Sequence, residues 1–486
     1  MSQSKHAIVI GGSVAGLCAA RVLSDAFERV TVLDRDSYPE GATDRKGVPQ
    51  SRHPHALLDG GRQRLERLFP GFEENMLAGG AHELDPGLDM AVLGADGWRP
   101  RRKTPHTLLF SSRVLIESVI RDLCGIHANV QFIERAEVTR LVSKGSPQKV
   151  CGVGLREAGG EEVELEADLV VDASGRETQS VKWLAELGLP APEQTVVNAD
   201  SGYSTRWYQG PSPEDRPKVF WWKSVWIEPI IDADARLEDQ YFALLFPVEG
   251  NRWIFTTASW GGRELARDPE TFERIISNLR SPVLADALKH AEPITPVYTR
   301  RGMQNSWRHY ERWSVELAGF ISTGDATCGF NPVYGQGMTS AACCALVLEK
   351  CLKQDDPSTA RFAKRFFREQ AKFLTTPWTM ATSRDLEQAK VVGKGEGRQP
   401  SRLAKIAQRL GTYYFTQIAM AAPRDPSIGT KLFEVINLSI HPNALIGDPR
   451  VLLRVVRARL LQRFWPAPKD DAAMADYPPA PAPARD

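Results

Sequence analysis

The sequence predicts an α/β protein. A parallel-sheet nucleotide-binding domain carries an inserted antiparallel β-sheet domain and is followed by a helical C-terminal region. The chain opens with "HAIVIGGSVAGLCAARVLSDAFERVTVLDRD", in which an apolar run, a glycine turn, an Ala- and Leu-rich helix and a second strand follow one another. Farther on, "YFALLFPV" and "RWIFTTAS" alternate as antiparallel strands do. Strands of two kinds therefore divide the chain.

A chain of 486 residues is long enough for two or three domains. The patterns place a nucleotide-binding domain in 1–194 and 297–345, with a substrate domain inserted at 195–296. A helical C-terminal region follows at 346–465. The Pro- and Ala-rich tail 466–486 has the composition of a disordered segment.

Composition excludes several functional classes. The 61 basic and 60 acidic residues give a net charge of +1, without the basic surplus that nucleic-acid binding requires. Seven cysteines form no C-x-x-C pair and no zinc spacing, which favours a reduced, cytoplasmic setting. The sequence contains no run of 18 apolar residues, so we expect no membrane span, and we expect no signal peptide.

A glycine turn joins the first strand to the first helix. "GGSVAG" nearly fits G-x-G-x-x-G, with Gly11, Ser13 and Gly16 at the three positions and Gly12 between them. Small residues here allow the turn, the approach of a pyrophosphate and close helix–strand packing. Asp34 ends the second strand, where a carboxylate can accept hydrogen bonds from a ribose. This Rossmann-type unit predicts a dinucleotide without separating NAD from FAD.

A second motif lies about 300 residues later in "GFISTGDATCGFNPVYGQGMTSA". A strand leads to Gly324 and Asp325, and a loop through Pro332 leads to Gly335 and Gly337 at the start of a helix. Backbone N–H groups at a helix N-terminus suit an electron-rich ring edge or a phosphate. We therefore expect these two distant segments to hold one long ligand.

Together these motifs resemble those of the FAD-dependent monooxygenases of the aromatic-hydroxylase superfamily, whose second motif G-D-A-x-x-x-x-x-P-x-x-G-x-G matches residues 324–337. The resemblance implies that FAD is the cofactor, that Asp325 contacts its ribityl chain and that Arg113 in "SSRVLIESVIRD" reaches its phosphate or ribityl region. The residues that we expect to bind FAD are Gly11, Gly12, Ser13, Gly16, Asp34, Arg35, Val48, Gln50, Arg113, Asp325, Pro332, Gly335 and Gly337.

The middle motif departs from the usual D-G of that superfamily. It reads "VVDASGRETQS" and is similar to the branch that contains alkene epoxidases, flavin halogenases and geranylgeranyl reductases. The reaction of the phenol hydroxylases is therefore not assigned to this sequence directly.

The stretch "RKGVPQSRHPHALLDGG" carries His53 and His55 in an H-x-H spacing. A metal site needs further ligands, and only Asp59 is close in sequence, so we expect none. The stretch resembles a signature of the bacterial flavin epoxidase branch, which acts on polyketide and terpenoid alkenes. We expect residues 47–53 to lie beside the flavin ring and a helix to begin near His55, with an ordinary surface loop as the alternative.

The resemblance implies a monooxygenase that takes electrons from NADPH or NADH, directly or through a separate flavin reductase. It would activate O₂ at the flavin C4a atom and add one oxygen atom to a lipophilic secondary-metabolite substrate, by epoxidation of a C=C bond. Aromatic hydroxylation, prenyl reduction of the geranylgeranyl-reductase kind and halogenation are the alternatives, and a flavin-binding protein without enzyme activity is a further one. Against halogenation, "WWKSVWIEPI" breaks the W-x-W-x-I-P spacing. No catalytic side chain is identified, because electrophilic oxygen transfer mainly requires positioning and exclusion of water.

Two features have more than one interpretation. The tryptophans of the inserted domain either line an apolar substrate cavity or fill a sheet face. The basic helix 449–465 either docks on its own domain, which we favour, or contacts a membrane surface.

Overall fold

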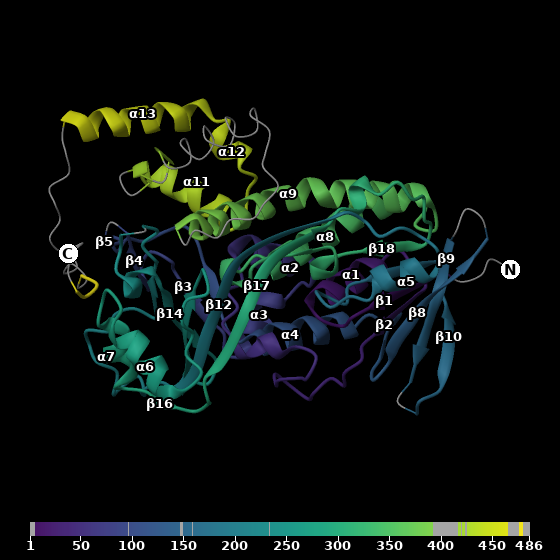
Figure 1. Ribbon diagram of the computed structural model, residues 1–486, viewed down its shortest axis with the longest axis horizontal. Coiled ribbons are helices and arrows are strands. Elements are labelled where there is room, and N and C mark those ends of the chain that lie inside the picture. Colours follow the sequence, from purple (N-terminus) through teal and green to yellow (C-terminus); the bar gives the residue numbers. More distant parts are fainter. Residues whose placement is uncertain are drawn as a thin grey trace.

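A parallel sheet forms the centre of the unit predicted from the first residues of the chain (Figure 1). Its strands, in spatial order, are β18 (Phe320–Ser322), β11 (Leu169–Asp172), β1 (His6–Ile10), β2 (Arg29–Leu33) and β7 (Val130–Ile133). Helix α1 (Val14–Ser24) packs against α4 (Arg113–Gly125) and α8 (Gly337–Leu352) beside this sheet. The predicted strand–turn–helix–strand order and the parallel sheet are confirmed.

The structure is a computed structural model. It describes residues 5–95, 97–145, 149–157, 159–232, 234–391, 417–418, 420–422, 425–464 and 476–479.

A small antiparallel sheet extends from one end of this unit (Figure 1). Its order is β10 (Glu162–Glu166), β9 (Lys149–Arg156) and β8 (Glu137–Lys144), and β9 contacts β11 of the parallel sheet. Helix α5 (Ser180–Glu186) contacts β8 of this small sheet. Elsewhere in the first unit, α2 (Asp59–Leu68) packs against α1, α8 and β6 (Leu108–Phe110), and α3 (Phe72–Ala78) packs against α4. Strand β6 pairs with β3 (His82–Leu84).

A large antiparallel sheet contains the two strands that alternation predicted in the middle of the sequence, which confirms that prediction. In spatial order it contains β19 (Cys328–Gly329), β17 (Tyr298–Arg308), β12 (Gln194–Gln209), β15 (Arg252–Ser259), β14 (Phe242–Val248), β13 (Ser224–Ile227), β4 (Met90–Gly94) and β5 (Gly97–Trp98), with β16 (Glu292–Pro293) paired to β12. Strands β4, β5, β17 and β19 lie outside the range 195–296, so the sheet is wider than the inserted segment. The parallel pairing of β4 with β13 joins remote segments, which local alternation does not predict.

The two faces of this sheet bury different neighbours. The outer face packs Trp253 and Phe255 with Trp222 against α6 (Pro269–Ser277) and α7 (Val283–Leu288). The inner face packs Ile254 and its neighbours against the β3–β6 pair and the segment before α2. Tryptophans therefore fill the outer core as well as the inner face, where Trp226 lies.

In the described ranges after the second motif, helices predominate, as predicted. The long α9 (Ala360–Val391) runs across the upper half of the molecule in Figure 1. Then follow α11 (Pro426–Ile436), α12 (Asn443–Ile446) and α13 (Pro449–Phe464), with α13 drawn above α9. Val451 and Val455 of α13 are buried in a cluster with α11, which supports docking of this helix on its own domain. Within the described ranges, every helix is too short or too polar to cross a membrane.

The predicted disordered tail lies mainly outside the described residues. Residues 476–479 are described, and the ring of Tyr477 packs against the outer core of the large sheet. These four residues therefore have a defined contact, because an aromatic side chain within the Pro- and Ala-rich segment meets an apolar surface.

Helix α2 begins at Asp59, so the expected start near His55 is wrong. His55 instead donates from its ring Nδ1 to the His53 carbonyl at 2.9 Å, and Leu58 keeps an extended backbone with ψ at 149°. The Asp59 N–H donates to Asn437 Oδ1 at 3.3 Å, so a distant C-terminal residue helps to set where the helix begins.

Candidate flavin site

The glycine turn brings backbone and carboxylate together at the end of β1. Gly11 has φ at +102°, a conformation that favours glycine. A Cβ added at Gly16 would lie 1.8 Å from the Gly11 carbonyl oxygen, which explains why the helix needs glycine at this point. The Gly12 N–H donates to Asp34 Oδ2 at 2.9 Å. The turn therefore holds the Asp34 carboxylate at the carboxyl end of β2, next to the carboxyl end of β1.

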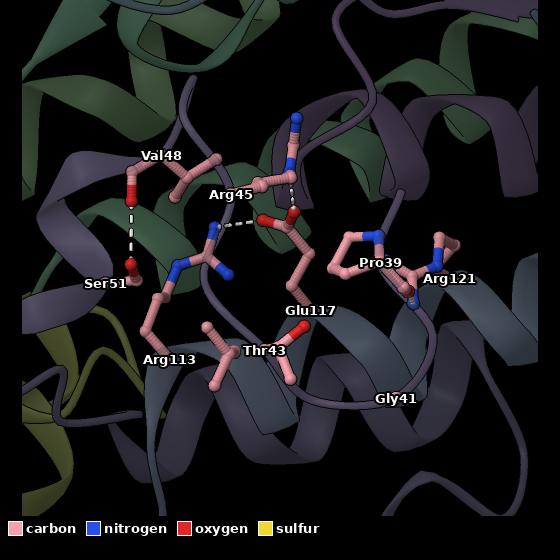
Figure 2. Close-up of a pocket in the computed structure, with 10 residues that line it drawn as sticks. Pro39, Gly41, Thr43, Arg45, Val48, Ser51, Arg113, Glu117 and Arg121 are labelled. Atoms are coloured by element: carbon pink, nitrogen blue, oxygen red, sulfur yellow. Dashed lines mark hydrogen bonds and ion pairs between the residues drawn. The ribbon is translucent and has the colours of Figure 1, made fainter. Parts of the chain in front are cut away.

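A buried group of charges lies beside the turn, with Glu117 between two guanidinium groups (Figure 2). Arg45 Nε donates to Glu117 Oε1 at 2.8 Å, and Arg113 Nη2 lies 2.9 Å from Glu117 Oε2. Arg45 also pairs with Asp34 at 3.0 Å. The Ser13 hydroxyl donates to Glu117 at 2.7 Å and accepts from Arg113 at 2.8 Å. Two arginines are thus held in fixed orientations beside the turn, in a form suited to phosphate.

The charges in this group stabilise one another. Burial by itself would raise the pKa of Glu117, but Arg113 and Arg45 hold it below its ordinary value. Burial would likewise lower the pKa of Arg45, but the carboxylates of Glu117 and Asp34 raise it well above its ordinary value. The Glu117 carboxylate and the Arg45 guanidinium therefore stay charged at neutral pH.

The second motif forms the opposite side of the site. Asp325 lies in the short helix η4 (Gly324–Ala326), and Arg176 Nε donates to its Oδ2 at 3.1 Å. Pro332 begins the short helix η5 (Pro332–Tyr334), and Gly335, with φ at +65°, ends it before α8 begins at Gly337. The predicted loop and helix start are therefore confirmed.

The two segments meet, and the polar atoms around them fit a dinucleotide. A Cβ added at Gly324 would lie 2.6 Å from the Ala15 side chain of α1. Arg113 Nη1 is buried without a hydrogen-bond partner among the described residues. At the start of α8, Gln336 Oε1 is a buried polar atom of the same kind. Buried polar groups are normally paired, so this set fits FAD, which carries phosphates, hydroxyls and ring polar atoms.

The other predicted residues differ in how they are placed. Val48 is buried, and its carbonyl accepts from the Ser51 hydroxyl at 2.8 Å (Figure 2). Arg35 and Gln50 are exposed, and Gln50 lies in the short helix η1 (Pro49–Arg52). The structure therefore gathers the turn, Asp34, Val48 and Arg113, and leaves the side chains of Arg35 and Gln50 at the surface.

His53 lies between the first unit and the large sheet. Its side chain is 6% exposed, its Nδ1 is 2.8 Å from Thr205 Oγ1, and its ring meets that of Tyr203 at 4.3 Å between centroids. Burial lowers the pKa of His53 to about 3 and that of His55 to about 4. Both rings are therefore neutral at physiological pH. Among the described residues no group of three or more His, Cys, Asp and Glu side chains is arranged to hold a metal ion.

The inner face of the sheet supplies an apolar wall beside this histidine. Tyr203 packs with Met303, Phe242 and Val333, and Val333 belongs to the loop of the second motif. Trp226 meets Phe242 edge-on at 5.9 Å. The first motif, the second motif and the sheet therefore converge on one region.

Three contributing residues were missed from the sequence. Arg45 opens the H-x-H stretch, and Arg176 follows the Ser-Gly of "VVDASGRETQS". Glu117 stands four residues after Arg113, a spacing that places both on one helix face and was the available signal.

Comparison with known proteins gives the family. No protein-family model matches the chain. Protein Rv3254 of Mycobacterium tuberculosis is 33% identical over 396 residues, which cover 78% of this chain and 80% of that protein. The chain belongs to the Rv3254 family.

Solved structures show the fold of this Rv3254 family member. The flavin-dependent brominase Bmp2 matches 95% of this chain and 99% of its own, at 15% identity and a TM-score of 0.62. A flavoprotein/dehydrogenase from Cytophaga hutchinsonii covers 94% and 99%, at 16% identity and 0.62. The p-nitrophenol 4-monooxygenase PnpA from Pseudomonas putida covers 90% and 99%, at 14% identity and 0.58. The chain therefore has the α/β fold of FAD-binding flavoproteins.

Proposed function

We propose that this protein is an FAD-dependent monooxygenase that adds one oxygen atom from O₂ to a lipophilic small molecule, by epoxidation of a C=C bond. The observation that carries the proposal is the set of buried polar atoms that lack partners among the described residues at the two converging motifs: Arg113 Nη1, on α4 beside the first motif, and Gln336 Oε1 in the second. A dinucleotide would give these atoms partners that the described residues do not supply. Flavoproteins of the same fold include monooxygenases and a halogenase.

The residues of the chain divide the work of binding. Asp34 and the turn would hold the adenosine half of FAD, and Arg113 its phosphates. Asp325 would accept from the ribityl hydroxyls, while the loop from Pro332 to Gly337 would present backbone N–H groups to the ring. Bound FAD would accept two electrons from NADPH or NADH, directly or through a separate reductase, and would activate O₂.

The wall beside the loop favours an apolar substrate. Phe242, Met303 and Val333 offer hydrocarbon surface, and the neutral His53 adds no charge to it. Such a wall excludes water and positions a hydrocarbon, which is what electrophilic oxygen transfer requires of the protein. An alkene of the polyene or prenyl kind fits this surface, and an aromatic ring is the second candidate of similar chemistry.

Binding of FAD is tested first. Wild-type protein should quench FAD fluorescence on titration, and Asp325→Ala should lose most of the affinity, because a ribityl partner is removed. Asp122→Ala is the matched control, since that carboxylate is 71% exposed on α4. A wild-type chain that ignores FAD would refute the proposal.

The reaction type is tested with the FAD-loaded protein, NADPH or NADH, and farnesol or 1-naphthol as probes under ¹⁸O₂. Farnesol that gains one labelled oxygen atom supports epoxidation. Labelled naphthol alone would replace epoxidation by aromatic hydroxylation. A product two hydrogens heavier would indicate a reductase, and a bromide-dependent product a halogenase. If neither nucleotide reduces the flavin, a separate reductase is required.

A further inference from the structure

A buried carboxylate joins the loop of the second motif to the C-terminal helices. Asp385 of α9 is 0% exposed. In the part of the chain that the structure describes, its two oxygens accept from four side chains. The donors are Trp260 Nε1 at 3.1 Å, Asn305 Nδ2 at 2.6 Å, Asn331 Nδ2 at 3.0 Å and Tyr334 Oη at 2.6 Å.

These donors come from three parts of the fold. Asn331 and Tyr334 flank Pro332 in the loop, Asn305 lies on β17, and Trp260 follows β15. Asn331 is itself 0% exposed, and its N–H donates to Asn305 Oδ1 at 2.8 Å. A single carboxylate therefore fixes the loop against the sheet and against α9.

All four donors are neutral, so among the described residues Asp385 accepts hydrogen bonds from no cationic side chain. Burial of a carboxylate is costly unless hydrogen bonds saturate it. An apolar residue at this point of α9 would avoid that cost, but would leave the loop donors unpaired. A carboxylate with two acceptor oxygens is well matched to donors that arrive from several directions.

We propose that Asp385 is a positioning residue that holds the loop from Asn331 to Gly337 in the conformation that receives the flavin ring. The proposal rests on the proposed function, because the ligand of that loop is FAD. It makes α9, which lies outside both sequence motifs, a part of the cofactor site. The adenosine half of the site, around Gly12 and Asp34, is independent of this network.

The substitution Asp385→Asn tests the geometry with little change of volume. Oδ1 accepts from Trp260, Asn331 and Tyr334, and Oδ2 from Asn305 and Asn331. An amide N–H₂ in place of either oxygen would therefore face another donor. A buried donor left without an acceptor is unfavourable, so we expect the loop to shift.

The readout compares FAD with ADP, which contains only the adenosine half. Asp385→Asn should weaken FAD binding about tenfold or more, and change the visible circular dichroism of the bound flavin, while ADP affinity stays within about twofold of wild type. Glu369→Gln, which removes a partly buried carboxylate of the same helix that pairs with Lys372, should change neither. Tyr334→Phe deletes one donor without a new clash and should give a smaller, FAD-specific loss, which serves as the test if Asp385→Asn does not fold.

Two results would overturn the inference. One is unchanged FAD affinity and an unchanged flavin spectrum in Asp385→Asn or, if that variant does not fold, in Tyr334→Phe. The other is a parallel loss of ADP and FAD affinity, which would mean general destabilisation. A wild-type chain that binds no FAD would instead refute the proposed function, and this inference with it.

Discussion

Acidification should destabilise the protein through His53. The imidazole is 6% exposed, and burial lowers its pKa from 6.5 to about 3. The folded state therefore disfavours the protonated ring. Stability from this group is fully present above the unfolded value of 6.5 and is lost as pH falls toward the folded value.

The size of the effect follows from these two values. Between about pH 7 and about pH 5 the unfolded chain takes up a proton at this position and the folded chain does not. The free energy of unfolding should then fall by about 2 kcal/mol from His53 alone. His55, whose pKa burial lowers to about 4, adds a similar contribution.

The perturbation is His53→Gln, which removes titration and keeps a polar group able to reach Thr205. Urea unfolding of wild type and variant at about pH 7 and about pH 5 gives the assay. The variant should lose about 2 kcal/mol less than wild type over this interval. His441→Gln, at an exposed position, provides the control for removal of a surface histidine. Equal pH dependence in wild type and His53→Gln would refute the reasoning that His53 is buried and neutral.

Three further substitutions test the fold and the site. Gly16→Ala places a Cβ 1.8 Å from the Gly11 carbonyl, so FAD binding followed by fluorescence should be lost, and binding equal to wild type would contradict the turn geometry. Phe246→Ala empties a fully buried position stacked on Phe110 at 4.1 Å, and should lower the free energy of unfolding by about 3–5 kcal/mol in urea titrations; a loss below about 1 kcal/mol would mean that the site is not packed as described. Arg113→Lys keeps the charge but loses the planar fork, so the dissociation constant for FAD should rise about tenfold, and no change would argue against a phosphate contact.

Local sequence features predicted the first unit well. The continuous apolar strand and the glycine turn need only near neighbours, and the Gly11 conformation with φ at +102° is a local requirement. The second motif was also predicted from the sequence, because a strand, an acid and the glycines before a helix follow one another within a short segment.

Contacts between remote segments were not predictable in this way. The sheet gains β4 through parallel pairing of Met90 with Ser224, and no turn joins these residues. Arg45 meets Glu117 across 72 positions of sequence. Asp385 looks like an ordinary helix-surface acid in the sequence and is fully buried.

The sequence by itself thus determined the fold class, the two flavin-type motifs and the order of the segments, because periodicity and backbone conformation depend on residues a few positions apart. Only the tertiary structure decided which polar groups share the site and where helix α2 begins. Burial and hydrogen bonding depend on what the rest of the chain places beside a side chain, as Asp385 and His53 illustrate.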